Sequence, residues 1–142
     1  RSHGRQLMRV KVEARPAGAC WGRQAQTTSE MNGVVMQIIT AENVAVADNP
    51  HGVDVRHLYT TPHVVVSQIT LEPGEVVKPH KAPVDAFFYV VEGAPSIEIE
   101  GETTVAAPGT LVPSALGHLH AIRNESDGRV RFLVVKTPNP RP

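Results

Sequence analysis

The sequence predicts an all-β protein with a single domain, and three observations support this prediction. Short apolar or alternating segments recur at intervals of roughly ten residues from Val34 onward, which is typical of sandwiches and barrels. The 142 residues include 12 Pro and 11 Gly, and many of these separate one segment from the next. A chain of this length suits one domain with a substantial core. Only residues 41–46 favour a helix, and they do so weakly.

The first clear strand is predicted for residues 64–71, which are rich in β-branched side chains and mostly alternate after the first residues. Turn residues around Pro73 and Gly74 end it, and a second strand then leads into His80. Residues 87–91 form an apolar run short enough for a buried strand. Because side chains alternate along a strand, Ala86, Phe88 and Val90 share one face and Tyr89 lies on the other.

The second half of the chain continues the β pattern. Residues 96–100 alternate, so Ile97 and Ile99 are predicted to face inward while Ser96, Glu98 and Glu100 face water, and Gly101 turns the chain. Further strands are predicted for residues 110–112, 120–124 and 130–136. Residues 125–128 read as a hairpin loop between the last two strands.

Composition limits the classes of partner. Lys plus Arg and Asp plus Glu are both 14, so the overall charge favours neither nucleic acid nor an acidic solvating tail, and a small molecule is the expected partner. Cys20 is the sole cysteine, which excludes an intrachain disulfide and suits a reducing compartment. No apolar run reaches about 18 residues and no signal peptide is seen, so a cytoplasmic location is expected.

Residues 1–30 form a basic N-terminal extension, with six Lys or Arg against two Glu, before the barrel domain of residues 31–142. The extension is either a native leader or a segment upstream of a start at Met31, and its first three residues resemble a tag remnant. If native, it is expected to pack on its own acidic barrel or on a second subunit of a homodimer, with Val10, Val12 or Trp21 as apolar anchors.

Two stretches, residues 74–93 and 109–124, carry regularly spaced Gly, His and Asn residues. The first reads Gly, five residues, His80, twelve residues, Gly; the second reads Gly, seven residues, Gly, two residues, His120, three residues, Asn. The fixed positions are Gly74, His80, Gly93, Gly109, Gly117, His120 and Asn124.

This spacing closely resembles the two motifs of the cupin superfamily over residues 64–136. The resemblance implies a jelly-roll barrel, or double-stranded β-helix, of two antiparallel sheets. It also implies a divalent metal held inside by three His and one Glu. His80 and His120 match ligand positions, whereas Ala82 and Ala86 stand where the motif has a His and the Glu, and Ala115 stands where it has Pro.

A third ligand would decide whether a metal is held, because Zn, Fe and Ni sites normally recruit three or four protein ligands. His118 has the parity of His120, and Asp85 lies one residue before the missing Glu position, where a bulge near Pro83 would redirect it inward. The candidate metal ligands are therefore His80, His120, His118 and Asp85. The other histidines in the barrel domain lie outside the two motifs and are further candidates only, a reserve set of His51, His57 and His63.

Three functions remain open from the sequence. The first is a metal-dependent enzyme of oxygenase, isomerase or lyase type that uses Fe, Mn, Zn or Ni. The second is a metal-free module that binds a small ligand as a sensor or carrier. The third is a metal-free isomerase with a His general base. Arg123 and Lys78 are expected at the surface, and Asn124 is expected to serve the end of its strand.

Overall fold

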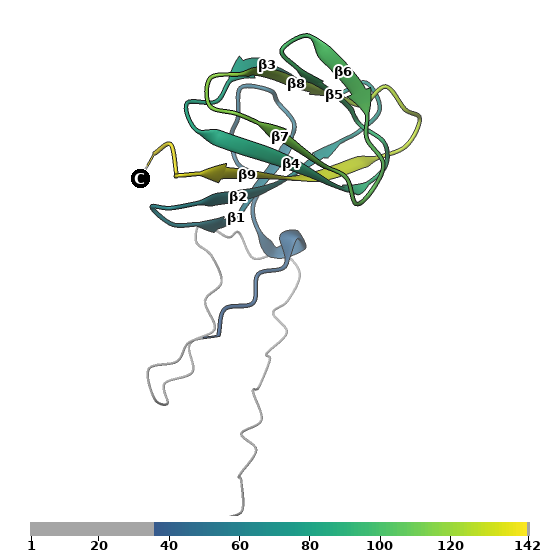
Figure 1. The fold of residues 1–142 in the computed structure, drawn as a ribbon. Coiled ribbons are helices and arrows are strands. Elements are labelled where there is room, and N and C mark those ends of the chain that lie inside the picture. The colour runs from purple at the N-terminus through teal and green to yellow at the C-terminus, as the bar shows by residue number, and fades with distance from the viewer. Residues whose placement is uncertain (1–35, 142) are drawn as a thin grey trace, which may run out of the picture.

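The structure is a computed structural model that describes residues 36–141, and this part of the chain is built almost wholly of strands (Figure 1). In chain order the elements are the 3₁₀ turn η1 (Ala41–Asn43) and the strands β1 (Asp54–Thr60), β2 (Val65–Leu71), β3 (Val76–Lys81), β4 (Asp85–Glu92), β5 (Ser96–Ile99), β6 (Glu102–Val105), β7 (Leu111–Ser114), β8 (Leu119–Arg123) and β9 (Val130–Thr137). The weak helical signal of residues 41–46 corresponds to η1.

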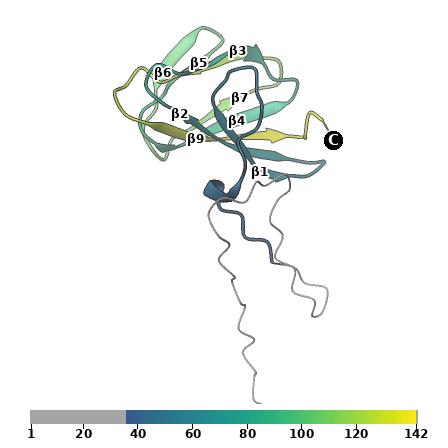
Figure 2. The same cartoon turned by 180° about the vertical axis from the view of Figure 1, so that it is seen from behind.

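The strands form two antiparallel sheets that face each other, as Figures 1 and 2 show from opposite sides. One sheet has five strands in the order β1-β2-β9-β4-β7, and the other has four in the order β3-β8-β5-β6. Most neighbours within a sheet are not consecutive in the chain, so the strands pass repeatedly from one sheet to the other. The predicted all-β jelly-roll architecture is confirmed.

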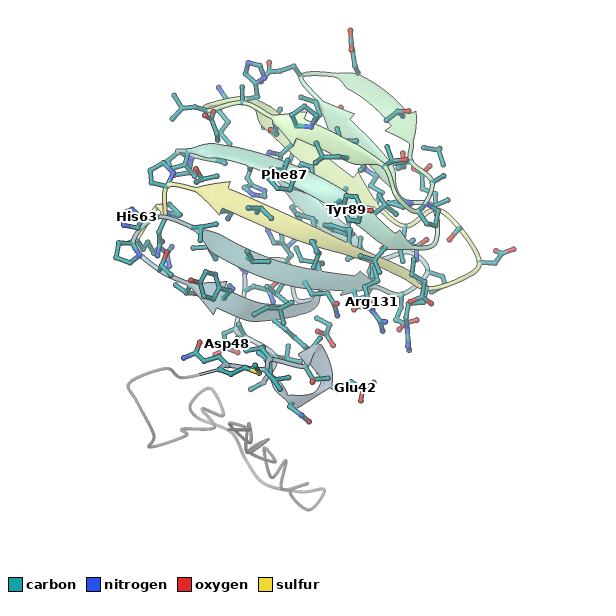
Figure 3. All side chains as sticks on the ribbon, turned by 60° about the horizontal axis from the view of Figure 1, so that its bottom comes forward. Glu42, Asp48, His63, Phe87, Tyr89 and Arg131 are labelled. Atoms are coloured by element: carbon teal, nitrogen blue, oxygen red, sulfur yellow. The ribbon has the colours of Figure 1, made fainter. Side chains whose placement is uncertain are left out.

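The predicted alternation holds for most side chains. Phe88 and Val90 are fully buried together with Ala86, while Tyr89 is exposed. Figure 3 views the outer face of the five-stranded sheet, where Phe87 and Tyr89 stand on β4. Ile97 is also fully buried, and the hairpin between β5 and β6 turns at Gly101 with the positive φ that glycine tolerates.

Two predictions from the sequence were wrong. Ser96, expected in water, is buried, because it begins β5 beside the buried Pro95 where the chain enters the four-stranded sheet. Residues 125–128 do not close a hairpin. β8 pairs with β3 and β5, whereas β9 pairs with β2 and β4, so this loop crosses from one sheet to the other.

Two strands, β1 and β6, were not predicted from the sequence, although the turn predicted at Gly101 leads into β6. β1 has no unbroken alternation in its sequence, because its pairing with β2 shifts register between His57 and Tyr59. Before the shift the register is regular, with Val55 buried and His57 opposite Ser67 of β2. The sequence therefore placed His57 outside any predicted strand, although it belongs to the inner row of an edge strand.

Asn124 closes one end of the barrel. Its Nδ2 donates to the carbonyl oxygens of Leu71 (2.9 Å) and Gly128 (2.8 Å), and its Oδ1 accepts from the backbone N–H of Ser126 (3.0 Å). The side chain is 1% exposed. Asn124 thus ties the end of β8 to the end of β2 and to the crossing loop, which confirms its predicted role at the strand end.

The predictions for the basic extension, including those for Cys20 and Trp21, lie outside the described residues. The homodimer and the cytoplasmic location stay predictions. Among residues 36–141 no helix is long and apolar enough to cross a membrane.

Candidate functional site

His80 and His120 meet at the end of the barrel opposite Asn124. They lie on the neighbouring strands β3 and β8, and their Cα atoms are register partners. The two Nε2 atoms are 3.1 Å apart, and the ring planes meet edge to face at 78°. The His120 ring also packs edge-on against the core residue Phe88, with centroids 5.0 Å apart. The expectation that both imidazoles enter the barrel and approach each other is confirmed.

The other nitrogen of His80 fixes its tautomer. Nδ1 lies 2.8 Å from the backbone carbonyl oxygen of Lys78. A carbonyl oxygen only accepts, so His80 Nδ1 carries the proton in this bond. The neutral ring therefore presents a bare lone pair at Nε2, the atom that faces His120.

His120 is held from the opposite sheet. Its Nδ1 lies 2.9 Å from Oγ of the buried Ser114, which ends β7. A hydroxyl can donate or accept, so this contact allows either tautomer of His120. Burial lowers the pKa of His120 to about 4, and the positive charges of His80, Lys136 and His51 add to the effect. The ring is therefore neutral at neutral pH.

His51 joins the pair from the loop before β1. Its ring centroid is 5.1 Å from that of His80, and its Nδ1 accepts the backbone N–H of Lys78 at 3.0 Å. Because Nδ1 accepts, the neutral ring carries its proton on Nε2. The Asn49 side chain shapes this loop by accepting from the backbone N–H of His51 (3.1 Å). His51 thus adds an N–H donor beside the pair.

Lys136 lies in the inner row of the five-stranded sheet at the same end. Along β9 the side chains of Val130, Phe132 and Val134 are buried, and Lys136 continues their parity. Its Cα partner on β4 is the buried Ala86, which is in turn the partner of Ser114 on β7. Burial lowers the pKa of Lys136, and the positive charge of Arg141 lowers it further.

His57 lies at the rim of this end on the edge strand β1, and the residue is exposed although its ring reaches the buried Ser67. Its Nδ1 lies 2.8 Å from Oγ of Ser67, and burial together with the charge of Lys136 lowers its pKa. We call the end of the barrel lined by His51, His57, His80, His120 and Lys136 the barrel mouth. Two of these residues were predicted as site residues and two were held in reserve. Lys136 was missed, although its parity with the apolar residues of β9 was visible in the sequence.

The other two candidate ligands are placed elsewhere. Asp85 is exposed, and its Oδ1 accepts the backbone N–H of Leu116 at 2.8 Å in the turn between β7 and β8. The pairing of β4 with β9 runs without a shift through Asp85 and Ala86, so no bulge turns the carboxylate inward. His118 is exposed in the same turn. His63, from the reserve set, is also exposed.

In residues 36–141 no group of three or more His, Cys, Asp or Glu side chains gathers into a complete metal cage. The two alanines at ligand positions of the motif are buried small side chains, with Ala82 2% exposed and Ala86 5% exposed, whereas Ala115 is exposed. The expected surface residues behave as predicted, since Lys78 is exposed and Arg123 forms an ion pair with Glu98 at 3.0 Å.

Comparison with known proteins identifies the family. The model of the cupin domain matches residues 67–136, which run from β2 to β9 and include His80, His120 and Lys136. Residues 67–136 form a cupin domain. As a cupin, it keeps two imidazoles of the usual ligand set and holds them together, and it has alanine at two other ligand positions.

Solved structures share the fold of this cupin. The TT1209 protein of Thermus thermophilus is 27% identical with a TM-score of 0.65, covering 74% of this chain and 100% of that one. An RmlC-like cupin of Methanocaldococcus jannaschii with a double-stranded β-helix fold is 21% identical, with a TM-score of 0.62 and coverage of 77% and 96%. The polyketide cyclase RemF of Streptomyces resistomycificus is 21% identical, with a TM-score of 0.67 and coverage of 76% and 83%. No curated protein matches the sequence.

Proposed function

We propose that this cupin binds a small molecule at the barrel mouth and that the Nε2 atoms of His80 and His120 hold a divalent metal there. The observation that carries the proposal is the 3.1 Å separation of these two atoms, with the Nδ1 atom of each ring anchored by an oxygen. Two nitrogens at this separation can share one ion with Zn–N or Fe–N bonds of about 2.0–2.2 Å.

The hydrogen bonds behind the rings suit metal ligation. A histidine ligand usually donates its second ring N–H to a carbonyl, carboxylate or water, which fixes the ring and its tautomer. The carbonyl of Lys78 already plays this part for His80. Ser114 plays it for His120 once its hydroxyl accepts instead of donating. Both Nε2 lone pairs would then face a common ion.

Within residues 36–141, the ion would have two protein ligands, Nε2 of His80 and Nε2 of His120. His51 is close, but its Nδ1 is engaged with a backbone N–H and its Nε2 carries the proton, so in this tautomer it is a donor and not a ligand. Water and the bound small molecule would fill the remaining positions. A metal held so openly would act as a Lewis acid or activate oxygen, as oxygenase, isomerase and lyase chemistry requires.

A second candidate function is supported by the same contact. Without metal, His120 Nε2–H donates to His80 Nε2, and the Ser114 hydroxyl donates to His120 Nδ1. This chain of hydrogen bonds leads from the buried serine to His80. A metal-free isomerase would use Nε2 of His80 as its general base once the substrate displaces the His120 N–H from it, and a metal-free carrier would use the pair to bind a polar ligand.

Metal analysis of untagged protein tests the first function. After loading and gel filtration we expect about one metal ion per chain, and less than about 0.1 in His120→Ala. His63→Ala is the matched control, because it removes an exposed imidazole that belongs to the turn after β1. Equal metal content in His120→Ala and wild type would place the ion elsewhere. Absence of metal from the wild type would favour the second function.

A further pair of variants tests the ligand set. Asp85→Asn keeps an oxygen that accepts from Leu116, and His118→Ala removes an exposed ring. We expect both to bind metal with wild-type affinity, measured by competition with a chelator of known affinity. A loss of about tenfold or more in either variant would mean that the turn between β7 and β8 moves to supply a third ligand.

A further inference from the structure

We propose that the small molecule bound at the barrel mouth is an organic acid and that the Lys136 ammonium binds its carboxylate. The inference rests on the proposed binding of a small molecule at the mouth, but it does not depend on a metal. It assigns a ligand class and an anchoring residue that the cupin motifs do not contain.

The position of Lys136 is fixed by sheet register. In an antiparallel sheet, directly paired residues point to the same face, and one row runs across β2, β9, β4 and β7 through Val65, Lys136, Ala86 and Ser114. Ala86 and Ser114 are 5% and 1% exposed, so this row faces the interior. Ser114 Oγ contacts His120, which brings the row to the imidazole pair.

The charge of Lys136 has no partner in the described part of the chain. The four ion pairs among residues 36–141 join Asp54 with Arg56, Glu98 with Arg123, Glu72 with Arg129 and Glu92 with Arg131. None of the side-chain hydrogen bonds in this part involves Lys136. A half-buried ammonium without a counter-ion is costly, and a ligand carboxylate would offset that cost.

The ionisable groups that act on the pKa values of the mouth residues are all bases, with Lys78, Lys136 and Arg141 carrying the charge at neutral pH. The groups whose charges act on the pKa values of His51, His57, His120 and Lys136 are Lys78, His80, His51, Lys136 and Arg141. The Asp85 carboxylate, the nearest acid in sequence to the row, is turned outward to Leu116. The mouth therefore presents a positive potential, which attracts an anion.

The mouth also offers a hydrogen-bond donor and a small side chain. His51 carries its proton on Nε2, because its Nδ1 accepts from the backbone. Ala86 is the smallest side chain of the row and is the direct neighbour of Lys136. A carboxylate located over Ala86 would thus meet an ammonium on the five-stranded sheet and the imidazoles of the opposite sheet. Charge-assisted bonds of this kind are stronger than neutral ones.

Titration calorimetry with malonate as the probe tests the inference, in the presence of EDTA so that no metal contributes. Malonamide is the matched neutral probe. We expect malonate to bind wild-type protein with at least about tenfold higher affinity than Lys136→Met, and malonamide not to bind. Lys81→Met is the charge-matched control, since Lys81 is exposed on β3, and we expect it to bind like wild type.

Equal affinity of Lys136→Met and Lys81→Met for malonate would overturn the inference, as would equal binding of malonate and malonamide. No saturable binding of malonate up to roughly 50 mM would overturn it as well. Metal analysis on separate, metal-loaded and EDTA-free samples of the same proteins separates this result from the proposed function. If the protein binds metal but not malonate, the organic-acid inference is wrong and the metal site stands. If it binds malonate through Lys136 but no metal, the metal site is wrong and the organic-acid inference stands.

Ala86→Glu gives an independent test. The new carboxylate would lie beside Lys136 in the same row and would occupy the place proposed for the ligand. We expect this variant to lose malonate binding. We also expect the double variant Ala86→Glu/Lys136→Met to unfold at a lower temperature than Ala86→Glu, because the buried carboxylate then has no cation beside it. Wild-type malonate affinity in Ala86→Glu would place the anion elsewhere.

Discussion

The two ends of the barrel interior are built by the same strands but differ in how their polar groups are satisfied. On β8, Asn124 follows directly at one end and His120 lies at the other, with the buried Ile122 between them. On β9, the inward residues run from Val130 at the closed end to Lys136 at the mouth. The closed end thus holds an amide and the mouth holds imidazoles and an ammonium.

At the closed end every polar atom of Asn124 has a partner within the protein. At the mouth, Nε2 of His80 contacts Nε2 of His120 and no backbone group, and the described residues give Lys136 no counter-ion. We infer that the buried amide at the closed end stabilises the fold, whereas the imidazoles and the ammonium at the mouth are available to bind a ligand. The predictions below test this division.

The largest effect is expected from Asn124→Ala. The change removes a donor from the buried carbonyl oxygen of Leu71 and one from the partly buried carbonyl oxygen of Gly128, and it leaves a cavity at the closed end. We expect a loss of about 4 kcal/mol in the free energy of unfolding, measured by urea denaturation. Malonate affinity in the fraction that stays folded should equal that of wild type. A stable Asn124→Ala protein with impaired binding would contradict the division between the ends.

The pH dependence of stability is expected to come from the mouth. The pKa of His120 is about 4 in the folded protein, against 6.5 for an unperturbed histidine, so between these values the unfolded chain binds more protons. Stability should therefore fall as pH falls from about 6.5 to 4, by up to about 3 kcal/mol at about 1.4 kcal/mol per pKa unit. The lowered pKa values of His51 and His57 act in the same direction.

Urea denaturation of metal-free wild type and His120→Gln at about pH 7 and about pH 4.5 checks this expectation. The variant has no titrating ring at this position, so its loss of stability on acidification should be clearly smaller. An equal loss in both proteins would assign the acid sensitivity to carboxylates elsewhere.

Ser114→Ala should have a smaller effect that is specific to the mouth. It removes the contact to His120 Nδ1 and should cost about 1 kcal/mol of stability. Since that contact would hold the ring in the ligating tautomer, metal affinity should fall about tenfold. Ser114→Thr, which keeps the hydroxyl, should restore much of the affinity. Loss of stability without loss of metal affinity would show that Ser114 serves packing alone.

The smallest effect has the opposite sign. Lys136→Met replaces a half-buried cation, which has no counter-ion within residues 36–141, by an apolar side chain of similar length. In the absence of anions the change should therefore raise the free energy of unfolding by up to about 1 kcal/mol. A thermal melt in a buffer without carboxylates measures the change. Destabilisation by a similar amount would mean that Lys136 has a partner that supports the fold.

Much of this fold could be predicted from the sequence, because alternation indicates the strands and glycine indicates the turns. Prediction failed where the tertiary arrangement decides. The loop at residues 125–128 looks like a hairpin loop, and nothing local reveals that β8 and β9 belong to different sheets. β1 was missed because a register shift interrupts its pattern at His57.

Part of the site could also be predicted from the sequence. His80 and His120 follow from motif spacing, and parity places both inside. His51 lies in a loop 29 residues before His80, and its approach depends on a bond to the backbone of Lys78. Asp85 was assigned an inward direction that required a bulge, and the continuous register at Ala86 excludes it. Lys136 was overlooked because a lysine near the end of a strand reads as a surface residue.

The place of β9 in the five-stranded sheet also governs how the chain is made. β9 lies between β2 and β4, yet it is the last of the described strands to leave the ribosome. Until it emerges, β2 and β4 each present an unpaired backbone edge. The row of Val65, Ala86 and Ser114 also lacks Lys136, which connects its two halves. The barrel therefore cannot close before residues 130–137 have been made. Truncated chains that stop before residue 130 should be held by chaperones or aggregate instead of forming a partial barrel.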